Sequence, residues 1–283
     1  MGFPHELVRR IERFAVLDKL TRPLTGLVGK AVQPRWVRNL LSGTHLGHPA
    51  HPMLTDLPIG AWSMSALLDT VGGAKSEPAA DLLIGAGILG AIPTAMTGLN
   101  DWSDTIEGET RVGAVHAGAN VAALGLYTAS LLARRSGRRG RGKALGLAGL
   151  GMLTVGGYLG GHLSYARAVN VNHTVFEHRP QEWTPVLADA DLGEGEYRKV
   201  LAGEAAVLLV RSAGRLYALA NTCSHAGGPL DEGELVNGCV VCPWHASTFR
   251  LTDGSIVRGP ASTPQPAYQT RVHDGKIEIR SLE

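Results

Sequence analysis

The sequence is poor in cysteine, in aromatic residues and in charge, and the cysteine and charge content exclude some classes of protein. With 3 cysteines in 283 residues, the chain cannot be held together by a framework of disulfide bonds. Its 27 basic and 25 acidic residues give a formal net charge of +2, which provides no bulk attraction to nucleic acid. Residues 1–14 lack the apolar core of a cleavable signal peptide. The few charges are unevenly spread, so the charge-free stretches are informative.

Long charge-free segments predict helices that cross a membrane. Asp, Glu, Lys and Arg are all absent from residues 82–100, 112–133 and 144–166. A bilayer core is crossed by about 20 apolar helical residues, so each segment is long enough to span. A weaker candidate, about residues 52–73, is interrupted by Asp56 and Asp69. A soluble helical core is the alternative, but its helices normally carry a charged face. We therefore predict a transmembrane helical bundle of three to four spans over residues 46–167.

The segments that flank this bundle have a different character. Residues 1–45 are basic, and Leu7, Ile11 and Phe14 share one helical face, as expected of an amphipathic segment at a membrane surface. Residues 168–182 form a polar linker. Residues 183–283 contain short β-like runs separated by Gly, Asp and Pro turns. The predicted fold is thus in two parts, an α-helical transmembrane bundle followed by an all-β domain.

Two paired motifs of metal-ligating residues lie in the β-rich part. Cys223 and His225 form a C-x-H pair, and Cys242 and His245 form a C-x-x-H pair. Structural zinc needs four ligands around one ion, and Cys239-x-x-Cys242 could supply a zinc knuckle. A catalytic cysteine needs one activated thiol rather than matched pairs. A Rieske [2Fe–2S] centre takes two Cys on one iron and two His on the other, which the two pairs match directly. Cys239 is then expected to be a buried, inert thiol.

These motifs resemble the cluster-binding loops of the Rieske family. The resemblance rests on CSHAGGPLDEGE and CPWHASTF, and on GSIVRGPAST, which is similar to the Gly-Pro segment that covers the cluster; it extends over residues 183–283. It implies a [2Fe-2S] cluster as cofactor, with Cys223 and Cys242 on an inner iron. It also implies that His225 and His245 bind an outer, more exposed iron.

Neighbours of the predicted ligands bear on the reduction potential. Gly228 and Trp244 stand where quinol-oxidising members carry two cysteines, so the resemblance implies that their disulfide is missing here. Ser247 stands where those members hydrogen-bond a cluster sulfide, and Phe249 replaces a Tyr that makes a second such bond. Pro260 lies in the covering segment. Hydrogen bonds to the sulfides raise the potential, so we expect a low-to-intermediate potential.

The domain sizes favour electron transfer over substrate chemistry. Only 38 residues follow His245, which leaves no room downstream for the mononuclear iron domain of an oxygenase. We predict a membrane-anchored carrier of single electrons between a redox partner or quinone-linked site and an acceptor, an electron-transfer component without substrate chemistry of its own. The alternative is a membrane transport or sensory module in which the cluster is a redox switch. The expected partners are membrane lipid and an electron donor and acceptor, such as a quinone or a reductase, but no nucleic acid.

The membrane part carries a motif and a set of histidines of its own. GHPAHPMLTDLPIGAWSMSALLD, residues 47–69, resembles an uncharacterised family of four-helix bacterial membrane proteins over residues 45–166. In a four-span arrangement His51, His116 and His162 lie on one side of the membrane, the last two at similar depth. We interpret the three as packing or interfacial residues; the alternative is a haem b with His116 and His162 as axial ligands.

The charges between the spans predict an orientation. The loop at residues 134–143 contains six basic residues and no acid, which places it in the cytoplasm of a bacterium by the positive-inside rule. One further crossing puts the β domain on the extracytoplasmic side of the cytoplasmic membrane. Arg138 and Arg139 precede the last span, but their surroundings match a twin-arginine export signal poorly, so we interpret them as topology determinants.

Overall fold

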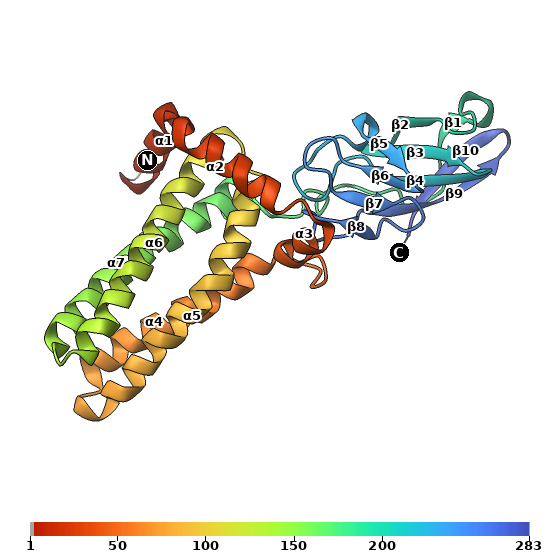
Figure 1. Cartoon of the computed structure of the whole chain (residues 1–283). Coiled ribbons are helices and arrows are strands. Elements are labelled where there is room, and N and C mark those ends of the chain that lie inside the picture. Colours follow the sequence, from red (N-terminus) through yellow and green to blue (C-terminus); the bar gives the residue numbers. More distant parts are fainter. Residues whose placement is uncertain (1–2, 283) are drawn as a thin grey trace. The chain divides into compact units, whose positions relative to one another are not determined.

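The fold is described from a computed structural model, in which residues 3–282 are placed well enough to describe (Figure 1). Contacts between residues divide the chain into two compact units. The helical unit comprises the residues up to Gln33 together with Ala50–Val169. The β unit comprises Pro34–Pro49 together with the residues from Asn170 onward. Each unit is described by itself.

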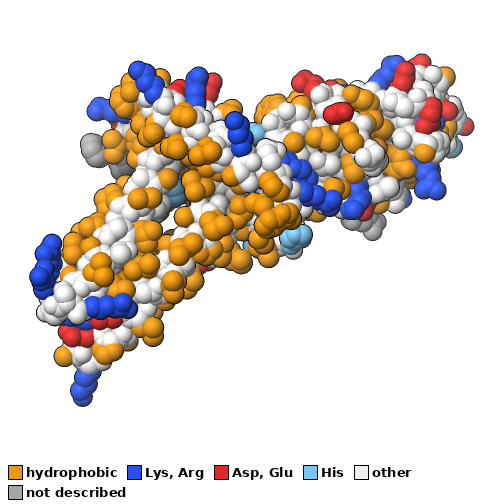
Figure 2. Space-filling view, viewed as in Figure 1, with side chains coloured by type: hydrophobic (Ala, Val, Ile, Leu, Met, Phe, Trp, Pro, Cys, Tyr) orange, Lys and Arg blue, Asp and Glu red, His pale blue; other side chains and the backbone are white. Residues whose placement is uncertain are grey.

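The helical unit is built from two long helical hairpins. Helices α4 and α5 form one hairpin and α6 and α7 form the other. The helices and short 3₁₀ turns are α1 (Phe3–Arg13), η1 (Ala15–Leu17), α2 (Asp18–Ala31), α4 (Ala50–Val71), η2 (Ala74–Ser76), α5 (Glu77–Trp102), α6 (Glu107–Arg135) and α7 (Arg139–Arg167). Within the described chain, three stretches are long and apolar enough to cross a bilayer: Ala74–Trp102, Glu107–Arg135 and Arg139–Arg167, with mean hydropathies of 1.7, 1.2 and 1.3. Figure 2 shows hydrophobic side chains along the visible face of this unit, with charged side chains gathered toward its ends.

Close packing inside the helical unit depends on glycine opposite aromatic rings. Trp62 of α4 stacks on Tyr127 of α6, with ring centroids 4.3 Å apart and an interplanar angle of 12°. A Cβ on Gly87 would lie 2.2 Å from the Trp62 indole nitrogen, and one on Gly149 would lie 2.9 Å from the Tyr127 ring. Such small residues let helices approach closely where lipid provides no hydrophobic drive for association. The frequent glycines of the sequence thus have a packing role here.

One of the two charges that interrupt the weaker candidate span, Asp69, is paired. The side chain of Arg134 is fully buried and donates hydrogen bonds to Asp69 of α4 and Asp81 of α5. Arg139 donates to Asp81 at 2.7 Å. Buried charges are costly unless paired in this way. Asp69, which weakened the first candidate span, therefore belongs to an ionic cluster at the end of the bundle that holds the basic loop.

The N-terminal helices pack against the opposite end of the bundle. Val8 of α1 is buried with Val112 and Leu159, and Ile11 packs against them. Leu7 and Phe14, predicted to share an apolar face with Ile11, remain half-exposed. Arg111 of α6 donates two hydrogen bonds to Asp18, at 2.7 and 2.8 Å. Part of the predicted membrane-surface segment is therefore bound to protein.

The β unit contains two antiparallel sheets. Its six-stranded sheet has the order β1-β10-β9-β4-β3-β2, and its four-stranded sheet the order β5-β6-β7-β8 (Figure 1). The strands are β1 (Thr184–Ala188), β2 (Tyr197–Ala202), β3 (Ala205–Ser212), β4 (Arg215–Ala220), β5 (Glu234–Val236), β6 (Cys239–Val241), β7 (Thr248–Arg250), β8 (Ile256–Arg258), β9 (Ala267–His273) and β10 (Lys276–Ser281). The predicted two-part fold, helical and then all-β, is confirmed.

Strand β3 explains where the core of the β unit sits. Successive side chains of a strand point to opposite faces, and both faces of β3 are buried. Val207 and Leu209 enter one hydrophobic cluster. Leu208 and Val210 enter the other, which also contains Cys223 and Cys242. The paired motifs are therefore anchored on the core and not on a free loop.

Candidate metal centre

The two motif loops have the same backbone geometry. Each follows a strand, β4 for the first loop and β6 for the second. In each, the N–H of the cysteine donates to the carbonyl five residues later, Cys223 to Gly228 and Cys242 to Ser247, both at 2.8 Å. The carbonyl of each cysteine accepts the N–H four residues later, from Gly227 at 2.9 Å and from Ala246 at 3.0 Å. Gly227 and Ala246 have positive φ angles of 79° and 58°. The sequence thus builds one loop twice.

The structure brings the four predicted ligands together. The thiols of Cys223 and Cys242 lie within hydrogen-bonding reach of each other, and both side chains are buried. The imidazole rings of His225 and His245 have centroids 5.0 Å apart and an interplanar angle of 87°, and both are half-buried. The cysteine pair therefore lies deeper than the histidine pair, as the inner and outer iron positions require.

This donor set fits a binuclear cluster better than a single ion. Between residues 3 and 282, no three His, Cys, Asp or Glu side chains converge on one point. Structural zinc needs four ligands around one ion, whereas a Rieske cluster places two cysteines on one iron and two histidines on the other. Cys239, the proposed partner in a zinc knuckle, lies in β6 and its thiol is near the Asn237 carbonyl. It is half-buried, not buried as predicted.

The acidity of the cysteine and histidine side chains reflects their proximity. The hydrogen bond with Cys223 lowers the pKa of Cys242 to about 7, and the same bond raises the pKa of Cys223. Burial, followed by the nearby His245, lowers the pKa of His225 to about 3. These shifts favour a thiolate at Cys242 and a neutral imidazole at His225, which are the protonation states that bind iron.

The surrounding residues take defined positions. Ser247 is fully buried, and its hydroxyl oxygen accepts the N–H of Ala261 at 3.0 Å, which leaves the hydroxyl proton to donate elsewhere. Phe249 is fully buried in β7. Trp244 is 54% exposed, beside His245. A Cβ on Gly228 would already lie 2.9 Å from the Cys242 sulfur, so this position needs glycine for the close approach of the two loops.

A helix expected to lie at the membrane surface packs on the covering segment. Helix α3 (Arg35–Ser42) and the turn after it belong to the β unit. The Asn39 side chain accepts the N–H of Gly259 at 2.9 Å, and the Thr44 hydroxyl donates to the carbonyl of Ala261 at 3.2 Å. Pro260, between these two anchors, is buried. Arg38 is 4% exposed, and its positive charge acts on His225. These contacts fall inside the predicted membrane-surface segment of residues 1–45.

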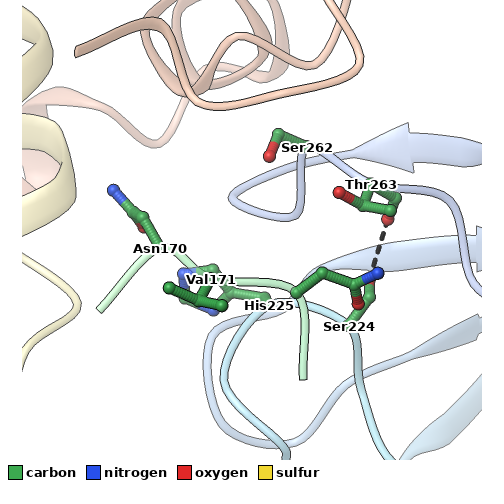
Figure 3. A pocket seen from close by; sticks show the side chains of 7 residues that line it. Asn170, Val171, Ser224, His225, Ser262 and Thr263 are labelled. Carbon is green, nitrogen blue, oxygen red and sulfur yellow. Dashed lines mark hydrogen bonds between the residues drawn. The ribbon is translucent and has the colours of Figure 1, made fainter. Parts of the chain in front are cut away.

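The linker and a buried glutamine also fix the first loop. The N–H of His173 donates to the carbonyl of Ser224 at 3.1 Å. Gln265, 2% exposed, accepts the N–H of Ser224 at 2.9 Å and donates to the carbonyls of Ala220 and Thr222 at 2.7 and 2.6 Å. Figure 3 shows a small hollow beside the loop, lined by Asn170, Val171, Asn172, Ser224, His225, Ser262 and Thr263. The sequence alone does not indicate that Gln265 binds this loop; the contact becomes evident only once the fold is known.

In the helical unit, His116 faces a histidine other than the one named in the haem alternative. His162 pairs with Glu12, with Nε2 3.1 Å from the carboxylate oxygen. The ring that faces His116 is that of His51, with centroids 6.4 Å apart and an interplanar angle of 80°. His116 therefore faces His51 and not His162, the partner named in the haem alternative, and His162 is engaged by a carboxylate of α1.

Comparisons with known proteins give two family matches. Residues 182–269 match the Rieske [2Fe-2S] domain, and residues 47–173 match a predicted membrane protein family, DUF2231. Similar proteins include the anthranilate 1,2-dioxygenase ferredoxin subunit of Burkholderia cepacia, 32% identical over 98 residues, which are 35% of this chain and 91% of that one. Mouse apoptosis-inducing factor 3 is 36% identical over 91 residues, but these are 32% of this chain and only 15% of that protein. Among solved structures, the ferredoxin of carbazole 1,9a-dioxygenase from Nocardioides aromaticivorans is 26% identical, with a TM-score of 0.34, over 36% of this chain and all of that one.

Proposed function

The chain belongs to the Rieske [2Fe-2S] family through its C-terminal part, and from this premise we propose that Cys223, Cys242, His225 and His245 hold its cluster. The family implies the [2Fe-2S] cofactor, which accepts and returns one electron at a time when bound. The cysteines provide thiolates from the buried side, and the histidines provide ring nitrogens from the half-buried side. One observation carries the assignment: the two loops repeat the same hydrogen bonds around their cysteines.

The assignment is tested by removing one histidine at a time. His225→Ala and His245→Ala should each abolish the visible spectrum and the electron paramagnetic resonance signal of the reduced cluster. His178→Ala is the matched control, because this side chain is 88% exposed and lies outside both loops. The iron content of full-length protein in detergent gives a second readout. Two irons per chain retained in His245→Ala would refute the assignment.

We propose further that the cluster serves a partner protein or a quinone-linked site as a one-electron carrier. The similar proteins named as ferredoxin subunits of dioxygenases support this role, because they match along most of their length. His225 and His245, which lie at the outer edge of the proposed cluster site, have different surroundings in this chain. Residues 170–172 and the charge of Arg38 lie by His225, whereas the half-exposed Trp244 lies by His245. We therefore assign electron exchange with the partner to the His245 edge.

The protein is integral to the membrane, as the DUF2231 match and three apolar helices indicate. We propose that the β unit lies on the extracytoplasmic side. The basic loop supports this, because Arg135, Arg138 and Arg141 remain exposed although Arg134 and Arg139 are paired with acids. Alkaline phosphatase fused after the last residue should then be active in cells, and a fluorescent protein fused there should be dark. The reverse pair of results would place the β unit in the cytoplasm.

A further inference from the structure

Two histidines from different hairpins of the helical unit face each other. His51 lies in the first turn of α4, and His116 lies in α6. Their ring centroids are 6.4 Å apart and their planes are nearly perpendicular, at 80°. Two imidazoles that bind one metal from opposite sides through bonds of about 2.1 Å have centroids roughly 6 to 7 Å apart. The observed separation of 6.4 Å falls within this range.

Both rings are held through the same nitrogen. The Nδ1 of His51 lies 3.0 Å from the carbonyl oxygen of Thr94, and the Nδ1 of His116 lies 2.8 Å from that of Gly156. A carbonyl only accepts hydrogen bonds, so each Nδ1 carries the proton and each Nε2 keeps its lone pair. A backbone carbonyl on Nδ1 is the usual support of a metal-bound histidine, because it fixes the tautomer and the ring orientation.

The number of ligands identifies the kind of metal group. No third His, Cys, Asp or Glu joins this pair to make a metal site in the part of the chain that is described. A bare zinc ion takes three or four protein ligands, so two histidines are too few for it. A haem iron receives four nitrogens from its own porphyrin and needs the protein only at its axial positions. We propose that the helical unit binds one haem b, with His51 and His116 as its axial ligands.

The type of haem follows from the cysteines. Covalent attachment of a c-type haem uses a C-x-x-C-H motif. The cysteines of this chain are Cys223, Cys239 and Cys242, and Pro243 follows the C-x-x-C pair. A haem in the helical unit is therefore held by its axial ligands and by packing alone.

The two rings lie between the hairpins, each beside a glycine. Helices pack extensively within each hairpin, whereas α4 and α5 contact α6 and α7 far less. Glycine lies against each ring: a Cβ on Gly98 of α5 would lie 2.7 Å from His51, and one on Gly160 of α7 would lie 3.0 Å from His116. Larger side chains at these two positions would push the imidazoles away from their present orientation.

One side chain competes with the metal. The amide nitrogen of Asn120 lies 3.2 Å from the Nε2 of His116, and it also donates to the His116 backbone carbonyl at 2.9 Å. Iron at Nε2 displaces the first contact and leaves the second. Asn120→Ala removes this competitor, so it should preserve or strengthen haem binding. The opposing interpretation is that Asn120 only holds the His116 side chain in a packed position, in which case neither His51 nor His116 binds iron.

The experiment uses full-length protein in detergent, purified from cells supplied with a haem precursor. The pyridine haemochrome assay should give one haem b per chain, and the reduced spectrum should be that of a low-spin, six-coordinate iron. His51→Ala and His116→Ala should each lower the haem content more than about tenfold. His162→Ala is the matched control, since it removes a histidine of the same unit that pairs with Glu12, and it should keep the haem. The resonance signal of the reduced cluster reports separately whether the chain has folded.

Rescue distinguishes a ligand from a packing residue. In His51→Gly and His116→Gly, added imidazole should restore the low-spin spectrum, which a merely structural histidine would not allow. Wild-type protein that holds no haem and takes none up on titration would overturn the proposal, as would full haem retention in His51→Ala. These results leave the cluster proposal intact, because the haem assay and the cluster signal are independent.

Discussion

Ser247→Ala provides the sharpest test of how the protein sets the potential of its cluster. Ser247 is fully buried, and its oxygen already accepts the N–H of Ala261 at 3.0 Å. The hydroxyl proton is therefore left to donate to a sulfide of the cluster. Such a bond is stronger with the reduced cluster, which carries one more negative charge, so its loss should lower the potential.

The expected size of the shift follows from the strength of one bond. A hydrogen bond to a charged group contributes about 1.5–3 kcal/mol. For a one-electron couple, a tenfold change in the equilibrium, or about 1.4 kcal/mol, corresponds to about 59 mV. If most of the bond energy is gained on reduction, Ser247→Ala should lower the potential by roughly 60–130 mV.

A redox titration followed by the cluster signal measures this shift, and Ser224→Ala is its matched control. Ser224 is also buried in a cluster loop, but its hydroxyl donates to the carbonyl of Thr263 at 2.8 Å and has no proton left for a sulfide. The control should therefore keep the wild-type potential. The reasoning fails if Ser247→Ala titrates like wild type, or if both serine variants fall equally.

Three further predictions concern stability. Gln265→Leu leaves two carbonyls and one N–H without the amide that binds them, and should destabilise the β unit by roughly 3 kcal/mol or more, seen as a lower midpoint for thermal loss of the cluster spectrum. Asn39→Ala leaves the N–H of Gly259 unbonded and should cost about 1–3 kcal/mol in the same assay. Hydrogen bonds from Ser255, first its hydroxyl and then its N–H, lower the pKa of Asp253 below the ordinary 3.8. The unfolded state then binds the proton more readily, so this stabilisation is complete above pH 3.8 and fades as the pH falls through the lowered folded pKa. Asp253→Asn should flatten that part of the stability profile.

The cluster loops could be predicted from sequence because their chemistry is local. Cys223 and His225 are separated by one residue, and Cys242 and His245 by two. The pairs can therefore be recognised without knowledge of the rest of the fold. The apolar strand β3 could be predicted for the same reason, since its run of buried residues is continuous. The residues that join the loops, such as Gln265, come from other parts of the chain, and no local pattern connects them to Ser224.

Helix α3 shows where an amphipathic pattern is ambiguous. A helix on lipid and a helix on protein both separate apolar from polar residues. In α3 the buried face contains the polar Arg38, Asn39 and Ser42, while Trp36 is 71% exposed. The inversion arises because this face binds the main chain of the covering segment and not apolar side chains. Composition could not reveal which face is inward.

The sequence could not show which histidine lies opposite His116, for a geometrical reason. The positions of His116 and His162 along their spans gave a common depth, but depth does not fix the direction in which a side chain points. Each residue of an α-helix turns by about 100° from the last, so the facing partner depends on helix rotation as well. That rotation is set by contacts such as His162 with Glu12, 150 residues apart in the chain.

Residues outside the Rieske match contact the covering segment and the His225 loop. The Burkholderia ferredoxin subunit is matched over 91% of its length, so little of it lies outside the shared fold. Asn39, Thr44 and His173 all lie outside residues 182–269, the Rieske match, yet they bind the covering segment and the His225 loop. The charge of Arg38 and residues 170–172 lie by His225, whereas the exposed Trp244 lies beside His245. This difference between the surroundings of the two histidines is the basis of the proposal that the partner exchanges electrons at the His245 edge.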